Sequence, residues 1–265
     1  MKVIITGAAG GIGTQIVDEL SAAHELYLID RVKVPGRKTL VHDLSQARAW
    51  GSRLEWRWFN TSEFMRAFSG ADVILHLAAE SLPEAPWKRI LRDNIQATQY
   101  VLETAAKHRV KRVVFASSNW AVKALERELA PACYLPGGPK LASDVSTRPL
   151  TDYGVSKALG EITGRMYVDQ KRLESFVAVR IGHFSPKPLT GGPSRDLWIG
   201  AGDLRSLLCR CVEAAFKGFH VVYGVSAQPT APYDLSHTRA LLQWEPHETF
   251  ESYGRRQSAI VHHVG

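Results

Sequence analysis

The chain has few cysteines. Cys133, Cys209 and Cys211 are the only three among its 265 residues, and they lack the paired spacing of a zinc site. An odd set without pairing also argues against a disulfide framework. We therefore expect no bound metal and a protein of the reducing cytoplasm.

Long apolar runs are absent as well. No segment approaches the ~18 consecutive apolar residues that a membrane span needs. The amino-terminal run Val3–Ile5 is too short for the core of a signal peptide. We therefore expect neither membrane insertion nor secretion.

The chain also lacks a strong cluster of one charge sign. Thirty-three Lys and Arg residues against 26 Asp and Glu residues give a formal net charge of +7. The basic residues fall in short, scattered groups without interleaved aromatic residues, which is not the pattern of a nucleic-acid site. They indicate a solvated surface, with general attraction of small anions as the alternative. We expect no nucleic-acid partner.

Strands and helices alternate along most of the chain. Apolar runs predict strands at 2–6, 26–29, 71–79, 113–117 and 176–181, and helical periodicity predicts helices at 12–20, 90–107, 153–170 and 203–217. Such alternation predicts an α/β fold with a doubly wound parallel sheet of the Rossmann type.

The third strand has two candidates. Residues 39–43 would place Asp43 at a carboxyl end, whereas Leu54, Trp56 and Trp58 alternate within 54–59. We favour 39–43, in which case residues 50–60 form an insertion. Proline and glycine predict irregular loops at 130–149 and 186–193.

A glycine-rich turn, Gly7–Gly13, follows the first strand and opens the first helix. In this context Gly7 permits a tight turn, Gly10 allows close approach of a pyrophosphate, and Gly13 lets the helix pack against the strand. The free N–H groups at the helix start favour phosphate. The turn predicts a dinucleotide site.

Asp30 ends the second strand, where a carboxylate accepts hydrogen bonds from the adenosine ribose and repels a 2′-phosphate. This favours NAD. The neighbouring Arg31 leaves two alternatives open, because an arginine at that edge accommodates the phosphate of NADP or is simply a solvated loop residue.

Tyr153 and Lys157 lie four residues apart and therefore on one helix face. A tyrosine acting as a base at neutral pH needs its pKa lowered by roughly 3 units, and a nearby ammonium favours the phenolate. The stretch Ser117-Ser118-Asn119 ends a buried strand upstream and offers hydroxyls to orient a substrate oxygen.

These motifs, in their order, resemble the extended short-chain dehydrogenase/reductase superfamily of the NAD-dependent epimerase/dehydratase type. They are Thr6–Gly13, His76–Ala79, Asn94, Ser117-Ser118, and Tyr153 with Lys157. Further stretches are similar to its uronate dehydrogenase-like branch, namely 115–119, 153–157, 179–182 and 222–226. The similarity covers nearly the whole chain. Related members oxidise hexuronates or hexose 6-phosphates at C1 with NAD.

The resemblance implies a role for each matching residue. Ser118, Tyr153 and Lys157 would be catalytic, with Tyr153 as the base. NAD would contact Gly7, Gly10, Gly11, Ile12, Gly13, Asp30, Asp43, Leu77, Ala78, Ala79, Asn94, Tyr153 and Lys157. The substrate would contact Ser81, Ser118, Asn119 and Tyr153.

Three residues depart from the branch and are further candidates for substrate binding. Trp120 stands where relatives have His, and it either packs or stacks on a sugar face. His183 stands where they have a small Ser, as a wall residue or a substrate ligand. Arg195 is the nearest candidate for the arginine that binds the substrate carboxylate, or else it pairs with Asp196 in an exposed loop.

We therefore expect one NAD-binding Rossmann domain over 1–265, with a small substrate lobe built mainly from about 183–265. The expected activity is NAD-dependent oxidation of a sugar at C1 to the aldonolactone, with a hexuronate as substrate. Hexose 6-phosphate or other aldose oxidation, nucleotide-sugar epimerisation and non-catalytic NAD sensing are the alternatives. The short stretch after Arg180 argues against the epimerase. We expect a homo-oligomer that binds a small anionic sugar.

Overall fold

A computed structural model describes residues 1–46, 62–186 and 195–250. Seven parallel strands form its main sheet in the order β3-β2-β1-β4-β5-β6-β9. The strands are β1 (Lys2–Thr6), β2 (Glu25–Asp30), β3 (Thr39–Val41), β4 (Val73–His76), β5 (Arg112–Ser118), β6 (Ser175–Ile181) and β9 (Gly218–Gly224). This arrangement confirms the predicted doubly wound α/β fold.

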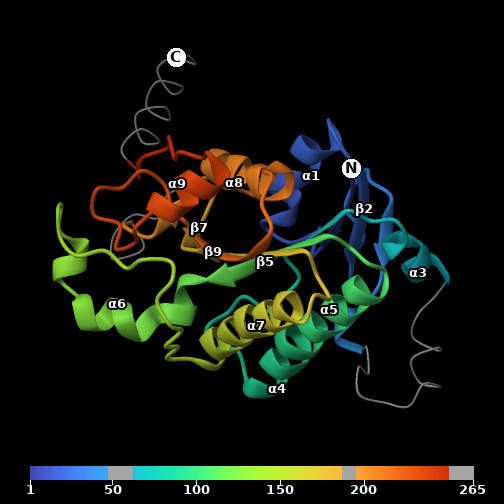
Figure 1. Ribbon diagram of the computed structural model, residues 1–265, viewed down its shortest axis with the longest axis horizontal. Coiled ribbons are helices and arrows are strands. Elements are labelled where there is room, and N and C mark those ends of the chain that lie inside the picture. Colours follow the sequence, from blue (N-terminus) through green and yellow to red (C-terminus); the bar gives the residue numbers. More distant parts are fainter. Residues whose placement is uncertain (47–61, 187–194, 251–265) are drawn as a thin grey trace, which may run out of the picture.

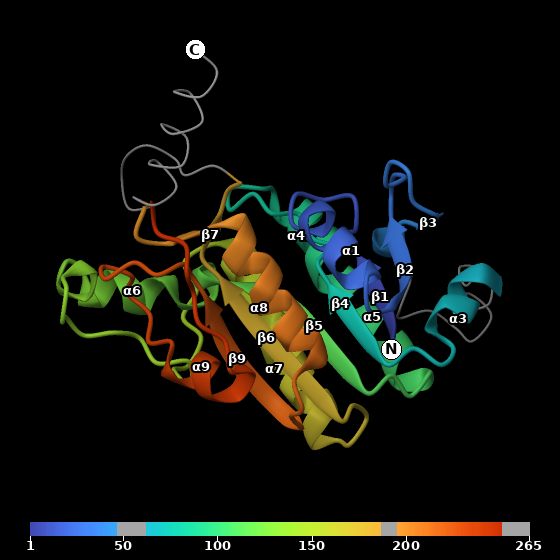
Figure 2. The ribbon, with the colours of Figure 1, turned by 90° about the horizontal axis from the view of Figure 1, so that it is seen from above.

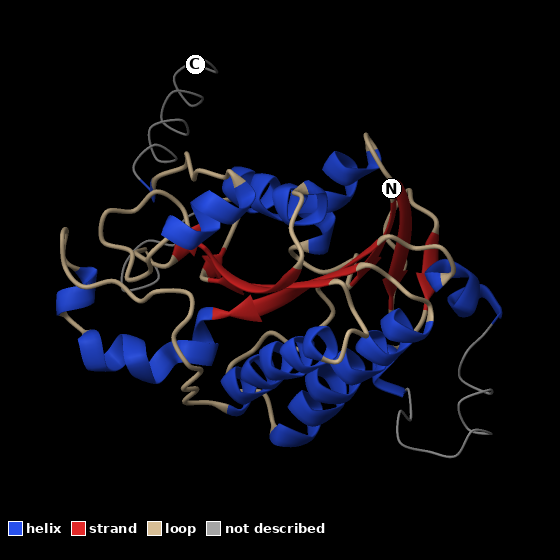
Figure 3. Cartoon of the chain, in the orientation of Figure 1, coloured by secondary structure: helices blue, strands red, loops and turns tan. Residues whose placement is uncertain are grey.

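Helices cover both faces of the sheet. Figure 1 shows α1, α8 and α9 on one face and α4, α5 and α7 on the other, and Figure 3 shows the same layers by type of structure. The helices are α1 (Gly13–Ser21), α3 (Ser62–Phe68), α4 (Trp87–Ile90), α5 (Ala97–Lys107), α6 (Lys123–Leu129), α7 (Asp152–Asp169), α8 (Ala201–Glu213) and α9 (Ser236–Leu242).

The core has two parts because the strands are buried on both faces. In β4, Val73 and Leu75 pack toward α1 and α8, whereas Ile74 packs toward α3 and α5. This is why its sequence is a continuous apolar run rather than an alternating one. Figure 2 shows α1 and α8 side by side above the strands, where the Arg205 and Glu19 side chains lie 3.8 Å apart.

The third strand is β3, within the favoured range 39–43. The other candidate, 54–59, lies outside the described residues, as does most of the loop 186–193. The region 130–149 is irregular apart from a short 3-10 turn, Ala132–Tyr134.

Three predicted elements need correction, and one strand was missed. The strand predicted at 71–79 is only Val73–His76, because the chain leaves the sheet to line the site. The helix predicted at 90–107 begins earlier, as α4, and continues through a π-helical turn, Leu91–Gln96, into α5. The last long helix ends at Glu213 rather than at 217, because the chain turns there into β9, a strand that was not predicted.

A second, two-stranded sheet follows β6. It pairs β7 (His183–Phe184) with β8 (Trp198–Ile199) in parallel. Among the described residues, no helix is long and apolar enough to span a bilayer.

Candidate functional site

The carboxyl ends of the central strands meet where the strand order reverses, between β1 and β4. The register pairs Thr6 with both Ile29 and His76, and Ser118 with Ile181. In doubly wound sheets the crevice outside such a switch point binds ligands. The predicted site residues of four strands therefore reach one edge of the sheet.

The glycine turn is closely packed at its two ends and open in the middle. Gly7 has φ +73°, and a Cβ there would lie 2.5 Å from Ala78 N. A Cβ on Gly13 would lie 2.4 Å from Gly7 O, so this glycine sets the contact of α1 with the turn. Gly11 has nothing within 4 Å of its Cβ position.

The start of α1 faces this open space. No side chain caps the helix, whose N-cap residue is Ile12. Thr14 N and Gln15 N already donate to Gly10 O and Ile12 O, both at 3.0 Å, so the backbone N–H groups suited to a phosphate are those of Gly11, Ile12 and Gly13 ahead of them. The apolar Ile12 side chain packs against the core, so only its backbone is suited to phosphate.

A cleft of about 300 Å³ continues from the turn. It is lined by Gly7, Ala9, Gly10, Ile29, Asp30, Arg31, Val32, His42, Leu44, Ser45, Leu77, Ala78, Ala79, Glu80, Ser81, Asp93 and Ala97. These residues include six of the thirteen predicted to bind the cofactor, namely Gly7, Gly10, Asp30, Leu77, Ala78 and Ala79, and also Ser81, which was predicted to contact substrate. A turn of glycines that leaves space where side chains would lie, next to the Asp30 carboxylate, fits a dinucleotide.

Asp30 is held at one end of this cleft. Its Oδ2 accepts a hydrogen bond from Ala9 N at 2.9 Å, and its Oδ1 accepts one from Val32 N at 3.2 Å. The carboxylate thus has a fixed orientation beside the glycine turn. Asp43 lies next to the cleft and accepts hydrogen bonds from Ser45 N and Oγ at 3.0 and 2.6 Å.

Asn94 ties the cleft to α7. Its Oδ1 accepts from Glu80 N at 2.7 Å, and its Nδ2 donates to Glu80 O at 3.1 Å and to Ser156 Oγ at 2.9 Å. Ser156 Oγ in turn donates to Tyr153 O at 2.7 Å. Asn94 is buried in the π-helical turn, so it fixes the loop after β4 against the start of α7.

His76 ends β4 and is buried. Burial and the Lys157 charge lower the pKa of His76 to about 3. Its Nδ1 lies 2.6 Å from Thr6 Oγ1 and its Nε2 3.1 Å from Thr98 Oγ1. His76 is therefore a neutral link between β1 and α5.

Ser118, Tyr153 and Lys157 come together at the end of β5, and all three are buried. Burial raises the pKa of Tyr153, and the Glu80 charge raises it further. The hydrogen bond with Ser118 lowers this pKa but does not offset the rise. Burial also lowers the pKa of Lys157 to about 8. The Lys157 ammonium donates to Ala116 O at 2.8 Å and lies 5.5 Å from the Tyr153 ring centre.

Helix α7 positions the pair through its first turn and its glycines. Thr151 Oγ1 caps the helix by accepting from Gly154 N at 3.1 Å. A Cβ on Gly154 would lie 2.5 Å from Trp120 O, and one on Gly160 would lie 2.3 Å from the Phe115 ring. Small residues at these places let α7 lie directly on β5.

Ser117 does not face the substrate side, although its hydroxyl was expected to help orient a substrate oxygen. It donates to Glu161 Oε1 at 2.6 Å, and Glu161 forms a buried ion pair with Arg180 at 2.8 Å. Burial by itself lowers the pKa of Arg180, but the hydrogen bonds and charge of Glu161 raise it overall. The sequence showed Arg180 only as part of the family resemblance.

Asn119 and Trp120 follow Ser118 directly. Ser118 Oγ donates to Asn119 Oδ1 at 3.2 Å and accepts from Trp120 N at 3.3 Å. The half-buried Trp120 packs against a small cluster of Ala85, Ile90 and Tyr153. Packing is thus observed for Trp120, and it places the indole beside the Tyr153 ring.

A buried carboxylate that was not predicted lies behind Asn119. Glu126 Oε2 accepts from Tyr233 OH at 2.6 Å, and its Oε1 accepts from Tyr134 and Lys123. Burial raises the pKa of Tyr233 well above its usual value, partly offset by a hydrogen bond with Asn119. Glu126 and Tyr233 are 107 positions apart, so no local sequence pattern predicts their contact.

His183 and Arg195 come from the small second sheet. His183 lies in β7, half-buried, and its N–H donates to Leu197 O at 2.6 Å. Arg195 precedes β8 and is exposed, with its guanidinium 5.0 Å from the Phe250 ring centre. Their place in the substrate site stays a prediction.

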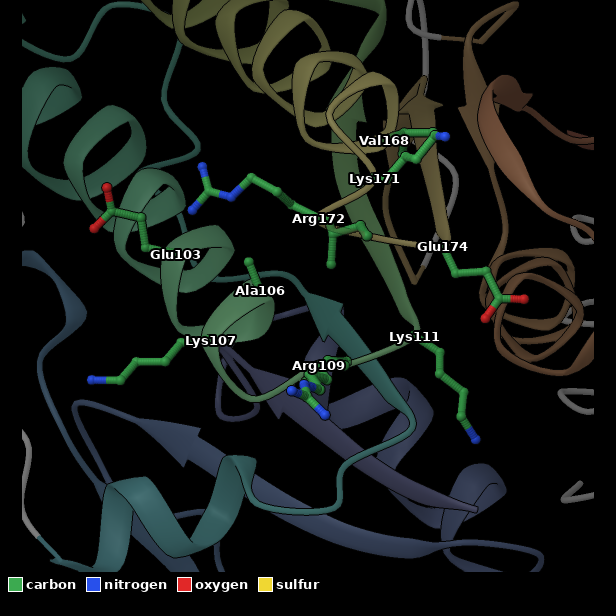
Figure 4. Close-up of a pocket in the computed structure, with 11 residues that line it drawn as sticks. Glu103, Ala106, Lys107, Arg109, Lys111, Val168, Lys171, Arg172 and Glu174 are labelled. Atoms are coloured by element: carbon green, nitrogen blue, oxygen red, sulfur yellow. The ribbon is translucent and has the colours of Figure 1, made fainter.

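A larger cavity, about 750 Å³, lies away from this crevice at the base of α5 and α7. Figure 4 shows Lys107, Arg109, Lys111, Lys171 and Arg172 around it, with Arg172 reaching toward α5. Several of these cations follow the carboxyl ends of two helices, where they complement the helix dipoles. These cations therefore have a structural explanation that does not require a ligand.

Comparison with known proteins finds a matching family model and several related sugar dehydrogenases. The model of the NAD dependent epimerase/dehydratase family matches residues 3–197. An NAD-dependent glucose-6-phosphate dehydrogenase of Haloferax volcanii is 32% identical over 93% of both chains. A uronate dehydrogenase of Agrobacterium fabrum is 32% identical over 96% of this chain and 87% of its own.

A solved structure agrees with these relatives. Uronate dehydrogenase from Agrobacterium tumefaciens superposes with a TM-score of 0.75 at 30% identity, covering 97% of this chain and 88% of the other. The expected resemblance to the extended short-chain dehydrogenase/reductases and to their uronate dehydrogenase-like branch is confirmed.

Proposed function

Because the chain belongs to the NAD dependent epimerase/dehydratase family, we propose that it is a sugar dehydrogenase that oxidises an anionic sugar at C1. NAD is its cofactor. The observation that carries the proposal is the buried cluster of Ser118, Tyr153 and Lys157 beside the dinucleotide cleft. Asn94 connects cluster and cleft through Ser156 and Glu80.

Tyr153 is the proposed base, which takes the proton of the anomeric hydroxyl. Burial and the Glu80 charge raise its pKa, so the phenolate needs positive charge nearby to form at neutral pH. Lys157 supplies one such charge from the same helix face. Tyr153 is thus suited to act with the cofactor in place rather than in the free protein.

Ser118 is proposed to donate a hydrogen bond to the substrate oxygen as charge develops on it. Its hydroxyl already bonds with Tyr153 and Asn119, so a substrate oxygen would be oriented between base and donor. When bound, NAD supplies the acceptor for the hydride from C1. The proposed product is an aldonolactone.

The substrate is proposed to be a hexuronate, with a hexose 6-phosphate as the second candidate. Arg195 and His183 would contact its anionic end, and Ser81, Asn119 and Trp120 its ring. The match to a uronate dehydrogenase and to a glucose-6-phosphate dehydrogenase supports both choices. Both substrates are anions, which suits a guanidinium.

A substrate screen tests this function. The full chain is mixed with NAD and, in turn, hexuronates, hexose 6-phosphates, neutral aldoses and nucleotide sugars, and reduced cofactor is measured. We expect turnover with one of the two anionic classes. Interconversion of nucleotide sugars without net reduction of NAD would instead make the chain an epimerase, and NAD binding without any turnover would make it a sensor.

The domain organisation and the oligomeric state of the chain are also proposals. We propose one NAD-binding domain whose substrate lobe uses β7, β8 and the segment after β9, because α8 and β9 belong to the main layers. We also propose a homo-oligomer of the cytoplasm. An exposed apolar stripe on α7 supports self-association, and the three free cysteines suit a reducing compartment.

A further inference from the structure

The adenosine end of the cleft holds a network of four charged side chains. Arg31 Nε donates to Asp43 Oδ1 at 3.1 Å, and its NH2 group lies 2.9 Å from Asp93 Oδ1. Arg92 binds both oxygens of Asp93, donating from Nε to Oδ1 at 2.7 Å and from NH2 to Oδ2 at 3.1 Å. The Asp93 side chain is only 4% exposed, whereas that of Arg31 is 49% exposed.

This network lies where the two nicotinamide cofactors differ. Arg31 directly follows Asp30, the carboxylate anchored beside the glycine turn, and both line the cleft with Asp93. An arginine at this edge accommodates the 2′-phosphate of NADP in other dinucleotide folds. Arg31 is therefore positioned to bind the 2′-phosphate of NADP, but its guanidinium already pairs with Asp43 and Asp93.

We infer that Asp93, with Asp43, holds Arg31 in ion pairs and so makes the cleft selective for NAD. The inference rests on NAD as cofactor and not on the identity of the sugar. A 2′-phosphate would have to draw Arg31 from two carboxylates, one of them buried. Drawing Arg31 away removes one of the two arginines that compensate the buried Asp93 charge, which is costly even though Arg92 remains.

The net charge of the cleft also favours NAD over NADP. Asp30, Asp43 and Asp93 contribute three negative charges, and Arg31 and Arg92 contribute two positive ones. Burial favours protonation of Asp93, but its hydrogen bonds with Arg92 and Arg31 outweigh this and keep its pKa low. A dianionic phosphate would therefore enter a region that already carries excess negative charge.

Asp93 is the better of the two carboxylates to change. Asp43 also accepts hydrogen bonds from Ser45 N and Oγ, so its replacement disturbs the turn that follows β3. Asn has the size of Asp, and both arginines reach solvent. Asp93→Asn should therefore release Arg31 without rearranging the cleft.

The test is a titration of NAD and NADP into the full chain, followed by intrinsic fluorescence and by the shift in Tm. The unsubstituted protein should bind NAD at least tenfold more tightly than NADP. Asp93→Asn should tighten NADP binding about tenfold, equivalent to about 1.4 kcal/mol, so that the ratio of the NAD affinity to the NADP affinity falls by about that factor. These readouts do not depend on turnover, so failure of the sugar assignment leaves them interpretable.

Two controls separate release of Arg31 from a general loss of negative charge. Asp93→Asn combined with Arg31→Ala should lose the gain for NADP, and Asp72→Asn, which unpairs Lys111 at a remote edge, should change neither affinity. An unchanged NAD to NADP ratio in Asp93→Asn overturns the inference, as does a gain that persists without Arg31. If Asp93→Asn does not fold, Asp43→Asn provides the second route, with the same expected direction.

Discussion

At the scale of single residues, burial acts on the reactive pair in opposite senses. It raises the pKa of the Tyr153 phenol and lowers the pKa of the Lys157 ammonium to about 8. Both changes favour the neutral forms, because each charge loses water. The free protein thus keeps its proposed base protonated, and the phenolate depends on the positive charges assembled around it.

Tyr153→Phe removes the phenolic hydroxyl and keeps the aromatic ring, which packs against Trp120 and Ile90. We expect turnover to fall by about 10²–10⁴, as for loss of a general base, with NAD affinity unchanged. Steady-state rates and a cofactor titration measure the two effects. Tyr27→Phe, on the remote β2 surface, serves as the matched control, and full activity in Tyr153→Phe would mean that another group takes the proton.

At the scale of elements, α7 has two faces with different tasks. Its buried face presents Tyr153 and Lys157 to the crevice, and its outer face exposes Val155, Leu159 and Ile162, followed by Met166. These four follow the spacing i, i+4, i+7 and i+11, which is one stripe of a helix. A continuous apolar stripe on a helix that carries the site suits a contact with a second copy.

Ile162→Glu should break this contact, because the side chain is 58% exposed in one copy and would bury a charge between two. We expect sedimentation velocity to show an oligomer for the unsubstituted chain and a smaller species for the variant, with folding preserved by circular dichroism. Arg165→Glu, exposed on the same helix, is the control for added negative charge. A monomeric unsubstituted chain, or an unchanged assembly in Ile162→Glu, would contradict the proposal.

Local patterns predicted the elements that form within one stretch of chain. The glycine turn with Asp30, the strand β5 and the helix α7 follow from periodicity and turn residues, and the structure has them. The strand β9 was missed although Phe219, Val221, Val222 and Tyr223 favour a strand, and its pairing with β6 establishes it in the sheet. Contacts such as Glu126 with Tyr233 and Arg31 with Asp93 need the tertiary fold, so no spacing predicts them.

At the scale of the molecule, positive charge is spread unevenly with respect to the crevice. The basic groups around the large cavity lie at the base of α5 and α7, whereas the dinucleotide cleft is rich in carboxylates. The net charge of +7 therefore does not explain how an anionic sugar would be recognised. Recognition must come from a particular residue, for which Arg195 remains the candidate.

Arg195 is suited to this task by chemistry and by its surroundings. Its guanidinium lies over the Phe250 ring, 5.0 Å from the centre, and a stacked guanidinium keeps its N–H donors directed outward in its plane. Such a fork binds a carboxylate or a phosphate through two parallel hydrogen bonds. The segment before β8 would thus deliver the anion contact from a part of the chain separate from the reactive cluster.

Arg195→Ala should raise the KM of the true substrate by about tenfold or more, roughly 1.4 kcal/mol, and leave NAD affinity unchanged. The effect should fall on KM because the contact holds an end of the sugar that does not react, and such binding contributes equally to ground and transition states. Initial rates across sugar concentrations measure it, with Arg205→Ala on α8 as a control that removes a cation paired with Glu19. A neutral aldose turned over as well as every acid and phosphate, or an unchanged KM in Arg195→Ala, would return Arg195 to the role of a surface loop residue.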